Sequence, residues 1–434
     1  MGDMVKMNGI IKLFEVLIRV LLPNKLSIEI LNRMKRTKNI LLSTTELRLF
    51  FKVILFPIIL LSSLIIAVIK ILLIWMLPYK MYYDIKYIVK QFYMDIAILK
   101  NVSLKKALKR ACLLYELFTK GYEKKISPGE LNPNITFYVI RPYYFLEPND
   151  LILSNVANLL TQYYYCLQKL SYAVEKGYIP VVDWENYGRL PHSEDYPING
   201  SNNSWEYYWQ QPSEYELTEV YNSKNVILST QNIGQFGYIP NCAMKPPFNV
   251  YAKNIIKNCP RYAKLIPLNR VTEDYVEKNY NLLFPKEGKV LGVIIRGSSY
   301  GKKGTQFSSH PMQIGIKELI KEIKKTLEAW EYDYIFFVNE VQEIVDIIKK
   351  EFGDRVIILP RMRDSISRPT DGSVLNPMYE DGQRYKTNLD YVTEIALLSK
   401  CDSIIGSMSS GTRTALIWNG GEYEHVYIFE KGLW

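Results

Sequence analysis

The sequence has few residues of the kinds that hold metal ions or disulfide frameworks. Among 434 residues there are three histidines and five scattered cysteines, and no CxxC pair occurs. A zinc site or a disulfide scaffold is therefore not expected, and we assign no metal to the chain. A GxSxG motif is also missing, and GSSYGKK at 297–303 is one residue too short for a Walker loop. Serine hydrolysis and P-loop chemistry are thus disfavoured.

The net charge of +10 belongs to one end of the chain. Residues 1–110 hold 19 Lys and Arg against 6 Asp and Glu, whereas the remainder holds 35 against 38. The near-neutral main body argues against a nucleic-acid partner. The basic end suits an anionic membrane surface instead.

The same end carries the longest apolar run, residues 53–77, which contains one charge, Lys70. Its length suffices for a helix that crosses a bilayer. However, Pro57 and Lys70 interrupt it, and its basic flanks give no clear orientation. A dipping, monotopic insertion fits as well, and a buried helical hairpin is the remaining alternative. With the amphipathic segment 10–22, this run predicts a helical, membrane-associated region over 1–110.

Beyond about residue 130, strands and helices alternate. The first half predicts a βαβ unit and one further strand, at 135–141 (strand), 154–176 (helix), 179–183 (strand) and 225–229 (strand). Between the last two strands, residues 184–217 are rich in Asn, Ser, Trp and Tyr. We expect this stretch to form a binding surface rather than a core layer.

The second half shows the alternation more clearly. Its predicted strands are 290–295, 334–339, 356–359, 403–406 and 426–429. Its predicted helices are 314–329, 341–352, 389–400 and 411–418, with a long loop at 361–387. Such alternation predicts a parallel sheet with ligands at the carboxyl ends of its strands. We therefore expect two α/β domains, 111–285 and 286–434, with a hinge at 284–289.

Two strand ends carry groups suited to an anion. Arg296 follows the strand 290–295, and its planar guanidinium can pair with diphosphate oxygens in a bidentate manner. The strand 403–406 runs into Ser407, and Ser409, Ser410 and Gly411 then open a helix, where backbone N–H groups and hydroxyls converge. A structural ion pair and a plain capping turn are the alternatives at these two places.

Carboxylates and one histidine complete the candidate site. Asp390 and Glu394 lie one turn apart on the helix before strand 403–406, where a carboxylate can accept from N1–H and N2–H₂ of guanine; a solvated helix face is the alternative. His310 can orient a substrate or cap a helix. The candidates for a general base are Glu340, Asp364 and Asp381, among which the sequence does not choose.

In this order, the segments resemble the fucosyltransferase superfamily, which includes the core α1,6-fucosyltransferases, the nodulation-factor fucosyltransferases and bacterial surface-polysaccharide relatives. The resemblance covers roughly residues 135–434. It is carried by SNVANLL (154–160), GYIPVVD (177–183), SWEYYWQQP (204–212), GVIIRGSSY (292–300), GTQFSSHP (304–311), YIFFVNE (334–340) and DYVTEIALLSKCDSIIGSMSSG (390–411).

The resemblance implies a GT-B-like fold of two Rossmann-like halves with a cleft between them, the first on the acceptor side and the second for the nucleotide sugar. It implies a metal-independent, inverting transfer from GDP-fucose to a glycan, with no further cofactor. Arg296 matches the diphosphate-binding arginine and Glu394 the acidic residue that reads guanine. Ser409 and Ser410 match the serine pair that contacts phosphate, and His310 matches the histidine of an HP pair.

Two departures from the family pattern leave alternatives open. Ser299 stands where the core enzymes have Asp, and Gln306 stands where they have an acidic residue linked to acceptor activation. A catalytically silent homologue that binds nucleotide sugars or glycans is therefore one alternative, and a transferase that uses another sugar nucleotide is a second. We expect the chain on the cytoplasmic face of a bacterial membrane with a lipid-linked acceptor, the secretory-pathway lumen being the alternative.

Overall fold

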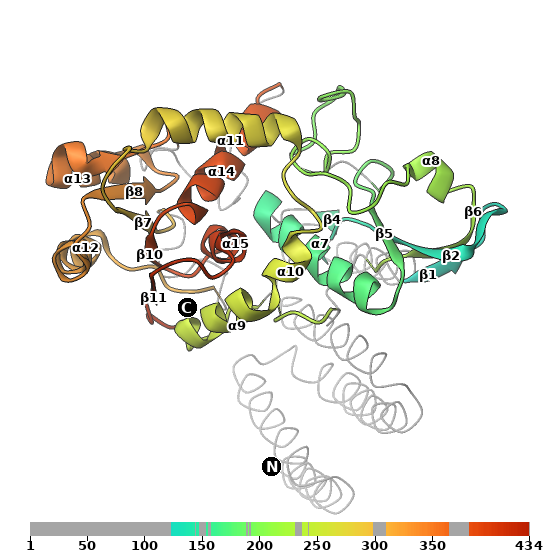
Figure 1. Cartoon of the computed structure of the whole chain (residues 1–434), viewed down its shortest axis with the longest axis horizontal. Helices are drawn as coiled ribbons and strands as arrows, with labels where there is room; N and C mark the ends of the chain where they lie inside the picture. Colours follow the sequence, from blue (N-terminus) through green and yellow to red (C-terminus); the bar gives the residue numbers. More distant parts are fainter. Residues whose placement is uncertain are drawn as a thin grey trace, which may run out of the picture. The chain divides into compact units, whose positions relative to one another are not determined.

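A computed structural model of the chain describes residues 123–143, 145–146, 153–154, 158–187, 190, 192–230, 237–241, 243–297, 310–363 and 382–433 (Figure 1). All of them belong to one compact unit, residues 91–434. The predicted membrane-associated region lies outside these residues. No helix within the described segments combines the length and the apolar character that crossing a bilayer requires.

In the second half the described elements alternate as the sequence predicts, whereas the first half also contains strands and helices that were not predicted, and residue 154 lies in a strand rather than in the predicted helix. The strands are β1 (Lys124–Ile126), β2 (Leu131–Ile140), β3 (Phe145–Leu146), β4 (Leu153–Ser154), β5 (Ile179–Val182), β6 (Ser223–Leu228), β7 (Val290–Ile294), β8 (Tyr334–Val338), β9 (Val356–Ile357), β10 (Ser403–Gly406) and β11 (His425–Ile428). The helices are α7 (Leu159–Glu175), α8 (Leu217–Val220), α9 (Phe248–Asn258), α10 (Pro260–Ala263), α11 (Arg270–Leu283), α12 (Ile316–Trp330), α13 (Gln342–Phe352), η3 (Gly353–Arg355), α14 (Arg384–Ser399) and α15 (Ser410–Asn419).

The first sheet has the order β1-β6-β2-β5. Strands β2, β5 and β6 run parallel, and β1 is antiparallel to β6. Because side chains alternate along a strand, Tyr138 and Ile140 of β2 join the core that contains α7, whereas Phe137 and Val139 join a smaller core on the opposite face. The predicted βαβ unit is therefore present as β2-α7-β5.

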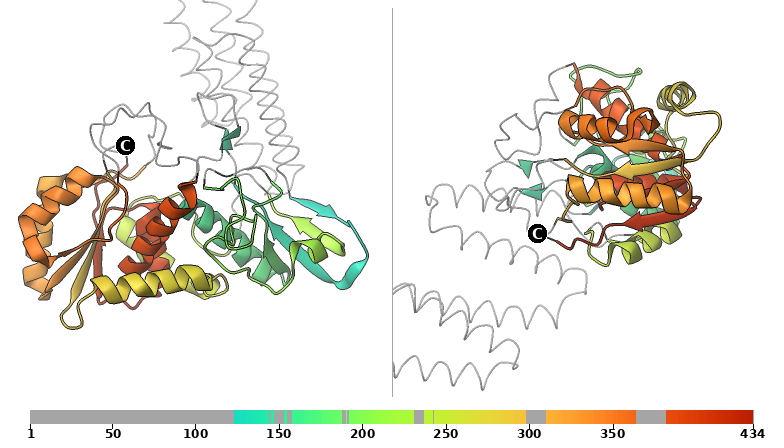
Figure 2. Two further views of the ribbon diagram at one scale, coloured as in Figure 1. Left: turned by 90° about the horizontal axis from the view of Figure 1, so that it is seen from above. Right: turned by 90° about the vertical axis from the view of Figure 1, so that its left-hand side faces the viewer.

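The second sheet is fully parallel, in the order β11-β10-β7-β8-β9. Read from β9 in chain order, this is 3-2-1-4-5, the order of a doubly wound nucleotide-binding fold. Leu291 and Val293 pack with α12 and α13, whereas Val290 and Ile294 pack with α14 and α15. Helices thus cover both faces of the sheet (Figure 2), and the α/β class predicted from the sequence is confirmed.

One hydrophobic core runs from the helical face of the first sheet to α14 and α15 of the second. The expectation that residues 184–217 form a binding surface was wrong, because Trp184, Trp205 and Trp209 are at most 2% exposed. Tyr163 of α7 stacks on Trp209 and accepts a hydrogen bond from Trp418 of α15 at 2.9 Å. Aromatic rings therefore join the two halves of the molecule.

Helices between the two sheets pack on the second sheet's layer. α11 contacts α14, and α9 contacts α15 and β11. Asn249 of α9 accepts from Ile428 N at 2.9 Å and donates to the Ile428 carbonyl at 2.7 Å. The predicted boundary at residue 285 thus follows a segment that already contacts α14, α15 and β11. The assignment of domains and the hinge at 284–289 stay predictions.

Lys169 of α7 is a buried amine. Its ammonium group donates to the Arg141 carbonyl at 2.5 Å, and no carboxylate contacts it among the described residues. Burial, aided by the positive charge of Arg141, lowers the pKa of Lys169 to about 7. The unfolded chain therefore binds more protons than the folded chain between pH 7 and the ordinary lysine value, and stability rises with pH across that window.

We predict that Lys169→Met raises the free energy of unfolding at pH 7 by about 1–3 kcal/mol, because the desolvation cost exceeds the lost hydrogen bond. The variant should also lose the rise in stability between about pH 7 and 10. Urea unfolding at several pH values measures both effects, with the exposed Lys253→Met as the control. A destabilised Lys169→Met protein would contradict this account.

Candidate functional site

The candidate site lies where the order of the second sheet reverses, between β7 and β10. Ile294 pairs with Gly406 at the ends of these strands, and Ser407 N donates to the Ile294 carbonyl at 3.1 Å. Ligands of doubly wound sheets bind at this switch point, outside the carboxyl ends of the strands. The segments that begin at Arg296 and at Ser407 therefore emerge side by side at the expected place.

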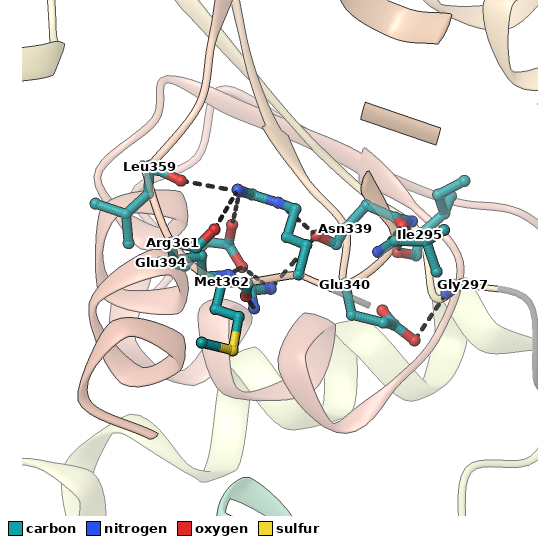
Figure 3. Close-up of polar contacts among 10 residues, drawn as sticks. Ile295, Gly297, Asn339, Glu340, Leu359, Arg361, Met362 and Glu394 are labelled. Atoms are coloured by element: carbon teal, nitrogen blue, oxygen red, sulfur yellow. Dashed lines mark hydrogen bonds and ion pairs between the residues drawn. The ribbon is translucent and has the colours of Figure 1, made fainter. Parts of the chain in front are cut away.

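Arg296 is held by its backbone and by a carboxylate. Its N–H donates to Gln313 Oε1 at 2.9 Å, and its Nε lies 3.6 Å from Glu340 Oε1. Glu340 follows β8 and also accepts from Gly297 N at 2.8 Å (Figure 3). The two side chains are 21% and 33% exposed. The structure therefore brings Arg296 and Glu340 together at an edge that solvent reaches.

Gln313 connects the two strand ends, and sequence reasoning missed it. It accepts from Arg296 N, and its amide donates to the Met408 carbonyl at 3.4 Å. His310 precedes it by three residues. Burial, together with the positive charge of Arg296, lowers the pKa of His310 to about 4. At neutral pH the imidazole near Arg296 is therefore uncharged.

The amino terminus of α15 completes the switch point. Ser409 caps this helix, and its Oγ accepts from Thr412 N at 3.1 Å. Ser410 and Gly411 occupy the first turn, where helix geometry leaves N–H groups unsatisfied and the helix dipole is positive. The capping turn is thus present, and its N–H groups lie next to the Arg296 segment.

Two further residues meet Ser410, and neither was singled out from the sequence. Asn158 caps α7 by accepting from Thr161 N at 2.9 Å, and its amide donates to Ser410 Oγ at 3.0 Å. The amino termini of α7 and α15 therefore meet. Tyr391 of α14 hydrogen-bonds Ser410, and burial raises its pKa despite the nearby charge of Arg296. The sequence analysis placed Asn158 inside the helix predicted at 154–176, whereas α7 begins only at Leu159 and Asn158 caps it.

Asp390 and Glu394 do not share one site. Asp390 accepts from Tyr275 OH of α11 at 2.9 Å and pairs with Lys386. Glu394 has no exposed side-chain surface and pairs with Arg361 and Arg363, which follow β9. Both carboxylates are thus engaged by the protein. A role of either one in reading guanine stays a prediction.

Several predicted residues lie outside the described part of the chain. They are Ser299, Gln306, Asp364 and Asp381. Among the described residues, no group of three His, Cys, Asp or Glu side chains is placed to hold a metal ion. The choice of general base and the independence from metal stay predictions.

Comparison with known proteins gives distant structural likenesses. No family model and no curated protein matches the chain. Fucosyltransferase NodZ from Bradyrhizobium is similar at 12% identity and a TM-score of 0.35, over 65% of this chain and 93% of that one. POFUT1 in complex with GDP is similar at 10% identity and a TM-score of 0.34, over 69% and 99%. Likenesses of this strength assign neither a family nor an activity.

The pKa of His310 predicts how acid affects the fold. The unfolded chain binds this proton near pH 6.5 and the folded chain only near pH 4, so stability falls as the pH falls through this window. We expect His310→Gln to remove about 1–2 kcal/mol of this loss of stability. The value is smaller than the free energy that corresponds to the full pKa difference, because the imidazole is partly exposed. Denaturant unfolding between pH 7 and 4 measures the slopes. Equal slopes for the two proteins would contradict the assignment.

Proposed function

We propose that the chain is a glycosyltransferase that binds the diphosphate of a sugar nucleotide at the switch point of the second sheet. The observation that carries the proposal is the adjacency of Arg296 and the amino terminus of α15 at the ends of β7 and β10. A guanidinium and a helix amino terminus are the two groups most suited to a diphosphate. Their meeting at a switch point favours a nucleotide over an isolated anion.

The chemistry needs a stabilised leaving group. Transfer breaks the bond between the sugar and the distal phosphate, so that negative charge grows on the departing nucleoside diphosphate. Arg296 and the N–H groups of Ser410 and Gly411 would stabilise that charge. The hydroxyls of Ser409 and Ser410 and the neutral imidazole of His310 add donors without adding charge.

The donor and acceptor follow from the resemblance of the ordered motifs. We propose GDP-fucose as the donor and a glycan, bound to a membrane lipid or part of a surface polysaccharide, as the acceptor. Inversion without a metal then calls for a carboxylate that takes the proton of the acceptor hydroxyl, or for a reaction that relies mainly on stabilisation of the leaving group. Glu340 is partly exposed beside Arg296 and is a candidate, with Asp364 and Asp381. Residues 1–110 would hold the enzyme at the membrane.

Arg296→Ala should lower turnover by about 10²–10³-fold, because it removes an electrostatic contact to the leaving group. Arg296→Lys keeps the charge but loses the planar guanidinium that pairs in a bidentate manner, so its turnover should lie between those of Arg296→Ala and the wild type. Release of GDP from GDP-fucose in the presence of glycan acceptors is the measurement. More than half of wild-type turnover in Arg296→Ala would refute the role. Tight GDP binding without turnover by the wild type would favour the silent homologue.

Asn158→Asp tests whether the diphosphate lies at the junction of α7 and α15. Aspartate caps helices as well as asparagine does, so the fold should keep its stability. Its charge next to Ser410 should weaken GDP binding by about tenfold or more. Asn158→Ser keeps a cap without the charge and should bind GDP nearly as the wild type does. Calorimetric titration with GDP decides, and undiminished binding by Asn158→Asp would place the diphosphate elsewhere.

A further inference from the structure

Two arginines share one buried carboxylate at the end of β9. Arg361 Nε and Nη2 lie 3.0 and 2.8 Å from Glu394 Oε2, and Arg363 Nη2 lies 3.0 Å from Glu394 Oε1. The side chains of Arg361, Arg363 and Glu394 are 5%, 3% and 0% exposed. Glu394 therefore offers no surface to a nucleotide in this arrangement (Figure 3).

One carboxylate cannot neutralise two guanidinium groups, so the group of three keeps one positive charge. Backbone carbonyls accept from further donors of both arginines. The Asn339 carbonyl accepts from Arg361 Nη2 at 3.3 Å and from Arg363 Nε at 3.2 Å, and the Leu359 carbonyl accepts from Arg363 Nη2 at 2.9 Å. Loss of the Glu394 charge would leave two like charges facing each other in a buried place, which is strongly unfavourable.

The shared acceptor, Asn339, connects this group to the proposed diphosphate site. The Asn339 side chain donates to the Ile295 carbonyl at 2.9 Å and accepts from Val341 N at 2.8 Å. The next residue, Glu340, accepts from Gly297 N and pairs with Arg296. The fit is tight, because a Cβ atom on Gly297 would lie 2.4 Å from a methyl carbon of Val341. A shift of the Asn339 turn would therefore move Arg296.

We infer that Glu394 is a positioning residue. It holds Arg361 and Arg363 against the Asn339 carbonyl, and the turn at Asn339 in turn positions Glu340 and Arg296 for the diphosphate. Other groups then read the base. This inference rests on the proposed function. It differs from the direct contact with guanine that the resemblance implied. A contact with guanine would require both ion pairs to open and a buried carboxylate to reach a ligand, and both changes are costly.

The test compares GDP with IDP, which lacks the exocyclic amino group of guanine. In Glu394→Gln we expect the affinities for both nucleotides to fall by the same factor, on the order of tenfold or more, so that their ratio stays at the wild-type value. If Glu394 reads guanine, it accepts from N1–H and N2–H₂ of GDP but only from N1–H of IDP, so the variant should lose more affinity for GDP than for IDP. The ratio of the two affinities would then fall towards one. Calorimetric titration of the full chain provides both affinities, with the exposed Glu422→Gln as the control.

Two further variants separate positioning from loss of the fold. Arg361→Lys retains Glu394 but loses the planar guanidinium that pairs with it in a bidentate manner, and we expect it to lower both affinities equally even if Glu394→Gln does not fold.

The losses of affinity should also be non-additive, because Glu394 acts through Arg296. The double variant Arg296→Lys/Glu394→Gln should therefore bind GDP about as weakly as Arg296→Lys does. Fully additive losses, or wild-type affinities in Arg361→Lys, would overturn the inference. A wild-type protein that binds neither nucleotide refutes the proposed function and this inference with it, whereas a changed ratio in Glu394→Gln refutes the inference alone.

Discussion

The pairing of β7 with β10 is the constraint on which the candidate site depends. These strands approach closely because Gly406 has no side chain; a Cβ atom there would lie 2.2 Å from the Ile294 carbonyl oxygen. The close pairing continues through Ser407 N, beyond the end of the strand. Arg296 and the first turn of α15, which follow the two strands, are thereby fixed at one edge. Backbone geometry, rather than any single side chain, brings the two segments of the candidate site together.

The charges around this edge divide into an exchangeable pair and a fixed group. Arg296 and Glu340 are partly exposed and 3.6 Å apart, so their pairing is weak enough for a ligand anion to compete with it. The group of Arg361, Arg363 and Glu394 is almost fully buried, so opening it would leave uncompensated charges. Such an arrangement combines a fixed positive group with an arginine that can exchange its carboxylate partner for a ligand anion. It is well suited to a ligand whose negative charge increases during the reaction.

Much of the second sheet could be predicted from the sequence, whereas long-range contacts could not. The strand 403–406 agrees with β10 because a short buried run is bounded by polar residues. Helix α14 begins at Arg384 rather than at the predicted 389, because Glu194, far away in the sequence, accepts from Gly382 N and Tyr385 N and supplies its cap. The same limitation hid the burial of Trp205 and the pairing of Glu394, since composition shows residue types and not their partners.

A structure of the protein with GDP bound tests the central claim most directly. The account predicts that the diphosphate bridges the Arg296 guanidinium and the N–H groups at the start of α15, with Glu340 displaced from Arg296 and the Glu394 ion pairs intact. Density for the diphosphate away from the ends of β7 and β10, with Arg296 still paired to Glu340, would contradict it.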